Sequence, residues 1–171
     1  MSEVIKGTEG NDVLVGVADN EANGHRMGDG TKILAGNGND TVIGSSENEY
    51  IKGGNGEDVL SGGAGHDDIR GDNGNDVMIG GAGNDILNGG GGTDLVVMSG
   101  KYSDYVITDP KGGWKTNFLV IKDKRGIDGT DYVQHQFTEY VQFSDGLYDV
   151  ANRVLVPMSV LCKEYIAGRS K

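Results

Sequence analysis

The sequence has few cysteine, aromatic and proline residues. Its 171 residues include one cysteine, one tryptophan, three phenylalanines and two prolines. The single Cys162 excludes an internal disulfide framework, and we expect it to be a small buried apolar side chain rather than a reactive thiol. The sequence also lacks a zinc-protease helix motif, a nucleophile elbow and a phosphate-binding loop outside the repeats described below. We therefore expect no enzymatic activity.

Long apolar runs and clustered basic residues are scarce as well. The longest apolar run, residues 154–162, is broken by Pro157, and it is too short to span a bilayer. The first twelve residues lack the apolar core of a cleaved secretion signal, so we expect any export to proceed without one. Residues 7–97 carry 16 acidic and 4 basic side chains. This charge disfavours nucleic acid and anionic lipid as partners and favours cations.

Glycine is abundant, and it recurs with a period of nine residues. Residues 53–97 read GGNGEDVLS, GGAGHDDIR, GDNGNDVMI, GGAGNDILN and GGGGTDLVV. Each unit has glycine at its first and fourth positions, aspartate at its sixth and an apolar residue at its eighth. A strict period of this kind is typical of a repeat architecture.

Weaker units precede this array. The nearly regular unit is 35–43, and the units 44–52, 26–34 and 16–24 carry Glu49, Thr31 and Glu21 at the sixth position. Residues 7–15 form another good unit, and His25 is one residue too many for the register. The pattern therefore predicts ten units with one slip.

Each unit divides into six residues that turn and three that extend. Glycine tolerates positive φ, so the first part can bend sharply and aim its carbonyl oxygens at one point. The last three residues form a minimal strand whose middle side chain points inward. These inward residues are Leu14, Asn23, Ile33, Val42, Ile51, Leu60, Ile69, Met78, Leu87 and Val96. The sequence predicts an all-β fold, a right-handed parallel β-roll with two units, about eighteen residues, per turn.

The sixth-position carboxylates are the candidate metal ligands. Units that stack on one edge of the coil are eighteen residues apart, so each ion would lie between two such units. One edge is expected to carry Asp40, Asp58, Asp76 and Asp94. The other is expected to carry Glu49, Asp67 and Asp85, with Asp12 and Thr31 further up. Calcium takes about 6 to 8 oxygen ligands from carboxylates and carbonyls, and we expect about four to five ions.

The glycines of the turns are expected to complete these sites with backbone carbonyls. They are Gly54, Gly56, Gly63, Gly65, Gly74, Gly81 and Gly83. The alternative, ordinary turns with solvated carboxylates, is disfavoured by five tandem units in strict register. The isolated GIDGTDYVQ of residues 126–134 fits the frame loosely. It has no partner unit eighteen residues away, so we expect Asp128 and Asp131 to lie in an ordinary turn. We expect His66, at a variable fifth position, to be an exposed side chain.

The period predicts four regions. Residues 1–34 are degenerate repeats, 35–97 the regular calcium-binding roll, 98–152 a β-rich cap, and 153–171 a tail. Strand candidates in the cap are 104–108, 117–123 and 139–144, separated by turn signals. A solenoid needs such a cap because an unpaired sheet edge invites aggregation.

The nonapeptide units resemble the RTX (repeats-in-toxin) family, whose calcium-binding pattern they match over 53–97 and more weakly back to Gly7. The segments DYVITDPKGGW and GTDYVQHQFTEYVQFSDGLYD are similar to those that follow such repeats in secreted bacterial proteins. The resemblance implies a calcium-binding β-roll in a monomeric, extracellular module. It also implies export by the type I secretion machinery and folding on contact with external calcium.

Two other functions remain open. The R-modules of secreted alginate epimerases are similar, which implies a polysaccharide-binding accessory module. An aromatic-basic cluster in the cap, Trp114 with Lys111, Lys115, Lys122, Lys124 and Arg125, could contact an anionic glycan. An adhesin or ice-binding segment would need a flat, regular outer face, which the mixed seventh and ninth positions disfavour.

Overall fold

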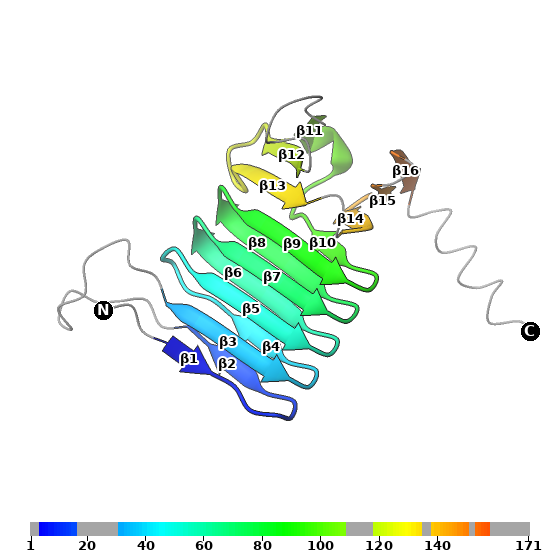
Figure 1. The fold of residues 1–171 in the computed structure, drawn as a ribbon. Coiled ribbons are helices and arrows are strands. Elements are labelled where there is room, and N and C mark those ends of the chain that lie inside the picture. The colour runs from blue at the N-terminus through cyan, green and yellow to red at the C-terminus, as the bar shows by residue number, and fades with distance from the viewer. Residues whose placement is uncertain (1–3, 17–30, 109–117, 135–137, 151–152, 158–171) are drawn as a thin grey trace, which may run out of the picture.

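The computed structural model describes residues 4–16, 31–108, 118–134, 138–150 and 153–157. Across these residues the chain consists of short strands and one 3-10 turn, η2 (Tyr102–Asp104). No helix among them is long and apolar enough to cross a bilayer. The strands form two eight-stranded sheets, named here sheet A and sheet B. Successive turns of the chain stack along one axis and form a flattened coil (Figure 1).

From β1 to β10, successive strands along the chain alternate between the two sheets. In spatial order, sheet A contains β1 (Val4–Lys6), β3 (Lys32–Asn37), β5 (Tyr50–Asn55), β7 (Asp68–Asn73), β9 (Ile86–Gly91), β13 (Thr130–Gln134), β12 (Phe118–Asp123) and β11 (Tyr105–Thr108). Sheet B contains β2 (Val13–Val15), β4 (Thr41–Ile43), β6 (Val59–Gly65), β8 (Val77–Gly83), β10 (Leu95–Val97), β14 (Tyr140–Phe143), β15 (Gly146–Asp149) and β16 (Val154–Pro157).

The register of the repeat strands confirms the parallel β-roll. Ile51 of β5 pairs with Ile69 of β7, and Leu60 of β6 pairs with Met78 of β8. Both pairs are parallel and join residues two repeat units apart. Successive units therefore alternate between sheets, and every second unit stacks on the same sheet.

The eighth position of each unit forms the core, as the sequence predicts. Eight such side chains are buried to within 1% of complete burial: Ile33, Val42, Ile51, Leu60, Ile69, Met78, Leu87 and Val96. Their neighbours on the strands face outward, for example Val59 and Ile86, which are 42% and 43% exposed. Leu14 packs against this core from one end, whereas Asn23 lies outside the described residues. One inward aliphatic row per sheet gives a thin core, so burial alone contributes modestly to the stability of each unit.

The cap begins after β10 with η2 and three of its strands match the predicted ones. β11, β12 and β14 correspond to the candidates at 104–108, 117–123 and 139–144. Aromatic packing fills the cap: the Phe143 ring lies 5.4 Å from that of Tyr102 and 5.2 Å from that of Tyr105, between centroids. Residues 154–157 of the tail form β16, and residues 158–171 lie outside the described part.

Both sheets of the roll continue beyond Val97. After β11 and β12 the chain returns as β13, which pairs in parallel with β9. It then crosses to sheet B as β14, which pairs in parallel with β10. Val133 and Val141 are fully buried and extend the two core rows by one residue each. The cap is thus joined to the roll through a further, discontinuous turn (Figure 1).

Candidate metal sites

The turns between sheets are built on glycines in a conformation that other residues rarely adopt. Gly83 has a φ of 136°, and a methyl group added to it would lie 1.6 Å from the carbonyl oxygen of Gly65 in the preceding turn. The same positive φ occurs at all seven glycines selected from the sequence: Gly54, Gly56, Gly63, Gly65, Gly74, Gly81 and Gly83. Backbone therefore packs directly on backbone from one turn to the next.

The sixth-position aspartates form two ladders along the edges of the roll. The backbone N–H of Asp58 donates to Oδ1 of Asp76, and the N–H of Asp76 donates to Oδ1 of Asp94, both at 2.9 Å. On the other edge the N–H of Asp67 donates to Oδ1 of Asp85 at 2.9 Å. Each aspartate therefore uses one carboxylate oxygen to hold the turn before it.

Six aspartates of the two ladders, called rungs here, each have a second carboxylate oxygen that is buried and has no partner among the described residues. These oxygens are Oδ2 of Asp40, Asp58, Asp67, Asp76, Asp85 and Asp94. Burial raises the pKa of Asp67 and of Asp76 to about 7, although the backbone hydrogen bond to each carboxylate opposes the rise. The charged form is disfavoured without a counterion because it is removed from water.

The orphaned oxygens converge with backbone carbonyls. A methyl group added at Gly53 would lie 2.3 Å from Asp58 Oδ2 and 2.8 Å from the carbonyl oxygen of Gly71, in the next turn. At Gly62 the corresponding distances are 2.1 Å to Asp67 Oδ2 and 2.7 Å to the Gly80 carbonyl oxygen. The first glycines of these two units thus border a space faced by a carboxylate from their own unit and a carbonyl from the next turn.

This donor set fits a hard cation such as calcium. It combines an unneutralised carboxylate oxygen with carbonyl oxygens, which are the ligands that calcium prefers. No group of three or more His, Cys, Asp or Glu side chains gathers in the described part of the chain. Backbone carbonyls would therefore supply most of the ligands, with the carboxylates at the sixth positions.

One position at the beginning of the roll, Asp12, departs from the predicted arrangement. Asp12 was expected on the edge of Glu49, but its N–H donates to Oδ1 of Asp40, 28 residues away, so that expectation is wrong. The cause is the spacing: β2 pairs with β4 at that interval, because ten residues are added between Gly16 and Thr31. Residues 17–30, including the unit at 16–24, lie outside the described part.

Glu49 occupies the predicted edge but uses its carboxylate differently. Its N–H donates to Asp67 Oδ1 at 2.7 Å, like the other rungs. Its own carboxylate accepts hydrogen bonds from the N–H and the hydroxyl of Ser45 at 3.1 and 2.5 Å. Its Oε2 still faces Gly44, whose added methyl would lie 3.0 Å from that oxygen. Glu49 therefore extends the same edge with a longer side chain.

The ladders end on two residues that the sequence analysis did not select. The N–H of Asp85 donates to Oδ1 of Asp131 at 3.1 Å, across 46 residues. The N–H of Asp94 donates to Oε2 of Glu139 at 2.8 Å. Burial raises the pKa of Asp131 to about 8.

The expectation that Asp131 lies in an ordinary turn is therefore wrong. Residues 126–134 occupy the next place on the edge of Asp85. An added methyl at Gly129 would lie 1.7 Å from the Gly83 carbonyl oxygen, as Gly83 itself stacks on Gly65. The signal was present in the Gly-x-x-Gly-x-Asp-x-Val frame of this segment, but the partner unit lies 46 residues away rather than eighteen.

The side chains at the fifth positions of the units form a separate ladder of hydrogen bonds, which the sequence did not predict. The N–H of His66 donates to the side-chain oxygen of Asn48 at 2.7 Å, and Nδ1 of His66 accepts from the N–H of Asn84 at 2.9 Å. His66 is exposed, as predicted, and it also stabilises the adjacent turn. His25, His135 and Cys162 lie outside the described residues.

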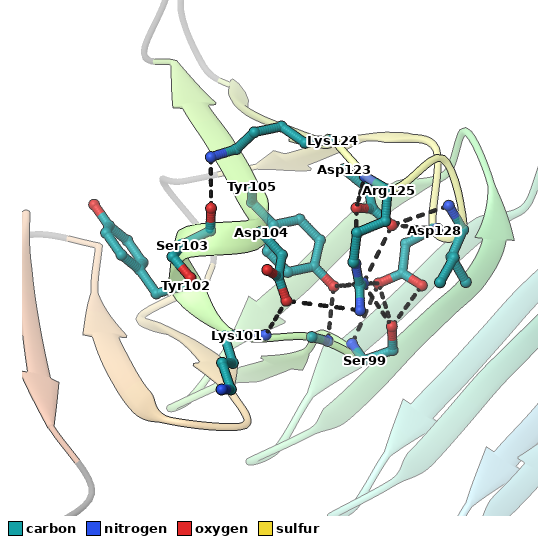
Figure 2. Close-up of polar contacts among 12 residues, drawn as sticks. Ser99, Lys101, Tyr102, Ser103, Asp104, Tyr105, Asp123, Lys124, Arg125 and Asp128 are labelled. Carbon is teal, nitrogen blue, oxygen red and sulfur yellow. Dashed lines mark hydrogen bonds and ion pairs between the residues drawn. The ribbon is translucent and has the colours of Figure 1, made fainter.

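The predicted aromatic-basic cluster of the cap is only partly described, because Lys111, Trp114 and Lys115 lie outside the described residues. Lys124 donates to the carbonyl oxygen of Ser103. Arg125 forms ion pairs with Asp123 at 3.0 Å and Asp128 at 3.4 Å (Figure 2). Lys122 is exposed on β12. Arg125 is therefore engaged within the cap.

Comparison with known families matches the repeats to one family model. The model of the RTX calcium-binding nonapeptide repeat, which comprises four copies of the unit, matches residues 2–20, 34–69 and 61–96. These ranges contain six rungs of the aspartate ladders, from Asp40 to Asp94. No curated protein matches the chain.

Proposed function

Because this chain contains an RTX calcium-binding nonapeptide-repeat β-roll, we propose that it is a non-catalytic module that folds on binding calcium and stabilises a larger extracellular protein. The observation that carries the proposal is the set of six buried Oδ2 atoms on the two edges that have no partner in the part of the chain that the structure describes. A buried carboxylate without a partner strongly destabilises a fold. Calcium supplies the missing positive charge and accepts these oxygens as ligands.

Binding and folding are coupled because no repeat unit holds a site alone. The space beside Gly53 is bordered by Asp58 from the same unit and by the Gly71 carbonyl from the next turn. An unfolded chain does not bring these groups together. A ligand that binds only the folded state shifts the folding equilibrium by mass action.

We expect four to five calcium ions in the regular roll. Consecutive rungs that would share an ion are Asp40 with Asp58, Asp58 with Asp76, Asp76 with Asp94, Asp67 with Asp85, and Glu49 with Asp67. The carbonyls of the seven turn glycines listed above would complete these sites.

The extracellular setting and type I secretion follow from the family resemblance. The charge supports them: without calcium the repeats are self-repelling and rich in glycine, which favours an unfolded chain. A low-calcium compartment would keep the module unfolded, and a calcium-rich one would fold it. We propose that secretion precedes folding for this reason.

Far-ultraviolet circular dichroism with and without calcium tests the proposal. The full-length protein in chelator should show a largely unstructured spectrum, and calcium should restore the β spectrum with a sigmoidal dependence on concentration. Magnesium at the same concentration is the control, because it holds its water and demands octahedral geometry. A chelator-resistant β spectrum in metal-free protein contradicts the proposal.

A second candidate function, binding of an anionic polysaccharide, is favoured by a surface of sheet A. The ring of Tyr50 lies between Lys32 and Arg70, whose charged groups are 5.1 and 5.2 Å from the ring centroid. A shallow groove of about 660 Å³ runs past Lys32, Tyr50 and Lys52. An aromatic ring flanked by cations suits a sugar ring that carries carboxylates.

This candidate is tested by binding of alginate oligomers to calcium-loaded protein. Tyr50→Ala should weaken binding through the groove. Lys122→Ala with Lys124→Ala should weaken it if the cap cluster is the contact. Equal binding by all three proteins, or none by the wild type, would remove this function. The adhesin alternative has less support, because the outward seventh positions of sheet A vary from Lys32 to Tyr50, Asp68 and Ile86.

A further inference from the structure

One edge of the roll carries a row of Asn–Gly pairs. The pairs are Asn37–Gly38, Asn55–Gly56 and Asn73–Gly74, at the third and fourth positions of three units that stack on one another. Asparagine deamidates readily before glycine, because glycine has no side chain to obstruct attack by its backbone nitrogen. We propose that these three asparagines are deamidation sites, which the folded roll protects and the calcium-free chain exposes. The inference rests on the proposed calcium-dependent folding.

The reaction needs only the chain and water. The glycine amide nitrogen loses its proton and attacks Cγ of the preceding asparagine, so that a new carbon–nitrogen bond closes a five-membered imide. The Cγ–Nδ2 bond breaks, and Nδ2 leaves as ammonia with a proton in place of the one that the glycine lost. Water then opens the imide at either carbonyl, which gives aspartate or isoaspartate. The attack therefore requires a free glycine N–H and an asparagine side chain that can rotate toward it.

The glycine N–H groups of the three pairs are occupied in the folded roll. The N–H of Gly38 donates to the carbonyl oxygen of Asn55 at 2.8 Å, and that of Gly56 donates to the carbonyl oxygen of Asn73 at 2.9 Å. Gly74 makes the same bond to the following turn at 2.8 Å. Each bond joins one turn to the next, so it forms only when the roll is assembled. A backbone N–H held in this way reaches solvent base only when the turn opens.

The asparagine side chains of the row are held as well. Nδ2 of Asn73 donates to Oδ1 of Asn55 at 2.9 Å, and Nδ2 of Asn55 donates to Oδ1 of Asn37 at 2.5 Å. Nδ2 of Asn37 donates to the carboxylate of Glu9. Asn55 and Asn73 are exposed to solvent, so burial does not protect them. Their protection comes from hydrogen bonds between turns, which are lost when the roll unfolds.

Both products of deamidation should oppose folding of the roll. Aspartate at position 55 has no amide to donate to Asn37, and its carboxylate faces the oxygen of that side chain. Isoaspartate lengthens the backbone by one carbon before Gly56. A methyl group added to Gly56 would lie 2.0 Å from the Gly38 carbonyl oxygen, so this turn has no room for a longer backbone. The time that a chain spends without calcium is thus recorded as a covalent change that hinders later folding.

Peptide mapping by mass spectrometry tests the protection. Full-length protein is incubated at mildly alkaline pH in calcium, in chelator, and in guanidinium chloride, and conversion of each side-chain amide to a carboxylate is measured. Asn37, Asn55 and Asn73 should convert at least about tenfold more slowly in calcium than in chelator, because the reaction requires opening of the turns. Asn39 and Asn75 are internal controls that should convert slowly in all three samples, because each precedes an aspartate.

The guanidinium chloride sample separates this inference from the proposed function. Equal rates in calcium and in guanidinium chloride at the three Asn–Gly pairs overturn the inference, whatever the effect of calcium on folding. A chelator sample that circular dichroism shows to be folded overturns the proposed function instead. In that case the three pairs should remain protected in chelator and react only in guanidinium chloride.

Refolding tests the consequence of the modification. Wild-type protein that is held in chelator for increasing times should recover less of its β spectrum when calcium is added. Replacement of the three asparagines by alanine should slow this loss, and alanine suits the position because Ala64 and Ala82 pair there on the other edge. Asn39→Ala/Asn75→Ala is the matched control and should lose recovery as fast as the wild type. Equal loss in all three proteins contradicts a role of the Asn–Gly pairs in folding.

Discussion

Asp58 and Asp76 are linked by a hydrogen bond from the backbone N–H of Asp58 to Oδ1 of Asp76. Asp76 in turn donates its own backbone N–H to Oδ1 of Asp94. The Asp76 side chain therefore serves two neighbouring turns, and its second oxygen has no partner among the described residues. The hydrogen-bond role and the charge of each rung can be separated by substitution.

Asp76→Asn should weaken calcium binding more than any change at the end of the ladder. The amide oxygen preserves the contact with the Asp58 N–H, whereas the charge shared by two sites is lost. We expect about two fewer ions for Asp76→Asn and at most one fewer for Asp12→Asn, measured by equilibrium dialysis. Without calcium the Asp76→Asn variant should be no less stable than the wild type, because an uncharged side chain is easier to bury. Equal losses in the two variants would contradict the edge assignment.

Acid should stabilise the calcium-free roll. Burial raises the pKa of Asp67 and Asp76 to about 7 from the ordinary value of 3.8. Because the folded-state pKa lies above the unfolded one, their favourable contribution is full below the unfolded value and is lost as pH rises through about 7. In calcium-depleted buffer the folded fraction, measured by far-ultraviolet circular dichroism, should therefore be larger near pH 5 than near pH 8. The Asp67→Asn/Asp76→Asn protein is the control and should show a flatter dependence.

Stabilisation of the roll by calcium should have the opposite dependence on pH. The ion binds the ionised carboxylates, so protons compete with it. The difference in folded fraction between calcium-loaded and calcium-depleted protein should shrink as pH falls. A difference that grows on acidification would show that other groups hold the metal.

Gly83→Ala should destabilise the roll even when calcium is saturating. The φ of 136° and the close approach to the Gly65 carbonyl leave no room for a methyl group. Backbone strain of this kind costs about 1–3 kcal/mol, and the contact adds to it. Gly91→Ala is the matched control, since the nearest atom to its added methyl lies at 3.6 Å. Chemical unfolding in excess calcium should separate the two variants, and equal midpoints would exclude the backbone-on-backbone packing.

Leu60→Ala should reveal how much each thin core row contributes. Leu60 is completely buried, whereas Val59 beside it is 42% exposed. Removing a buried leucine side chain typically costs about 2–5 kcal/mol. Val59→Ala should cost much less, because its side chain already contacts water. Thermal unfolding of both variants in excess calcium tests the inward assignment of the eighth position.

The sequence predicts the regular part of this fold because two independent signals share one period. An apolar residue at the position of Leu60 and an aspartate at the position of Asp58 recur in every regular unit. A one-residue slip would expose the apolar side chain and move the aspartate away from its edge. The positive φ of the turn glycines follows from the same frame. The alternation between sheets then places Asp58, Asp76 and Asp94 on one edge, as the structure has them.

The places of Asp12, Asp131 and Glu139 depend on the length of the chain between units, which a local pattern does not encode. Asp12 lies on the edge of Asp40 because ten extra residues precede Thr31. Asp131 rejoins the roll only after the chain has formed β11 and β12, and Glu139 completes the other edge through β14. The frame of 126–134 was visible in the sequence, but its partner was identified only by the strand pairing.

The aspartate ladders give the two ends of the roll unequal roles. Each amide is satisfied by a carboxylate from the following turn, so loss of the first turn leaves only an unused acceptor. Loss of Asp131 or Glu139 would instead leave the buried amide of Asp85 or Asp94 without a partner, and such a donor costs about 1–3 kcal/mol. The stack thus has a fixed terminus at the cap and an extensible one at β1 and β2. Turns can be added or removed at the end formed by β1 and β2 without changing the contacts of Asp131 and Glu139 at the cap.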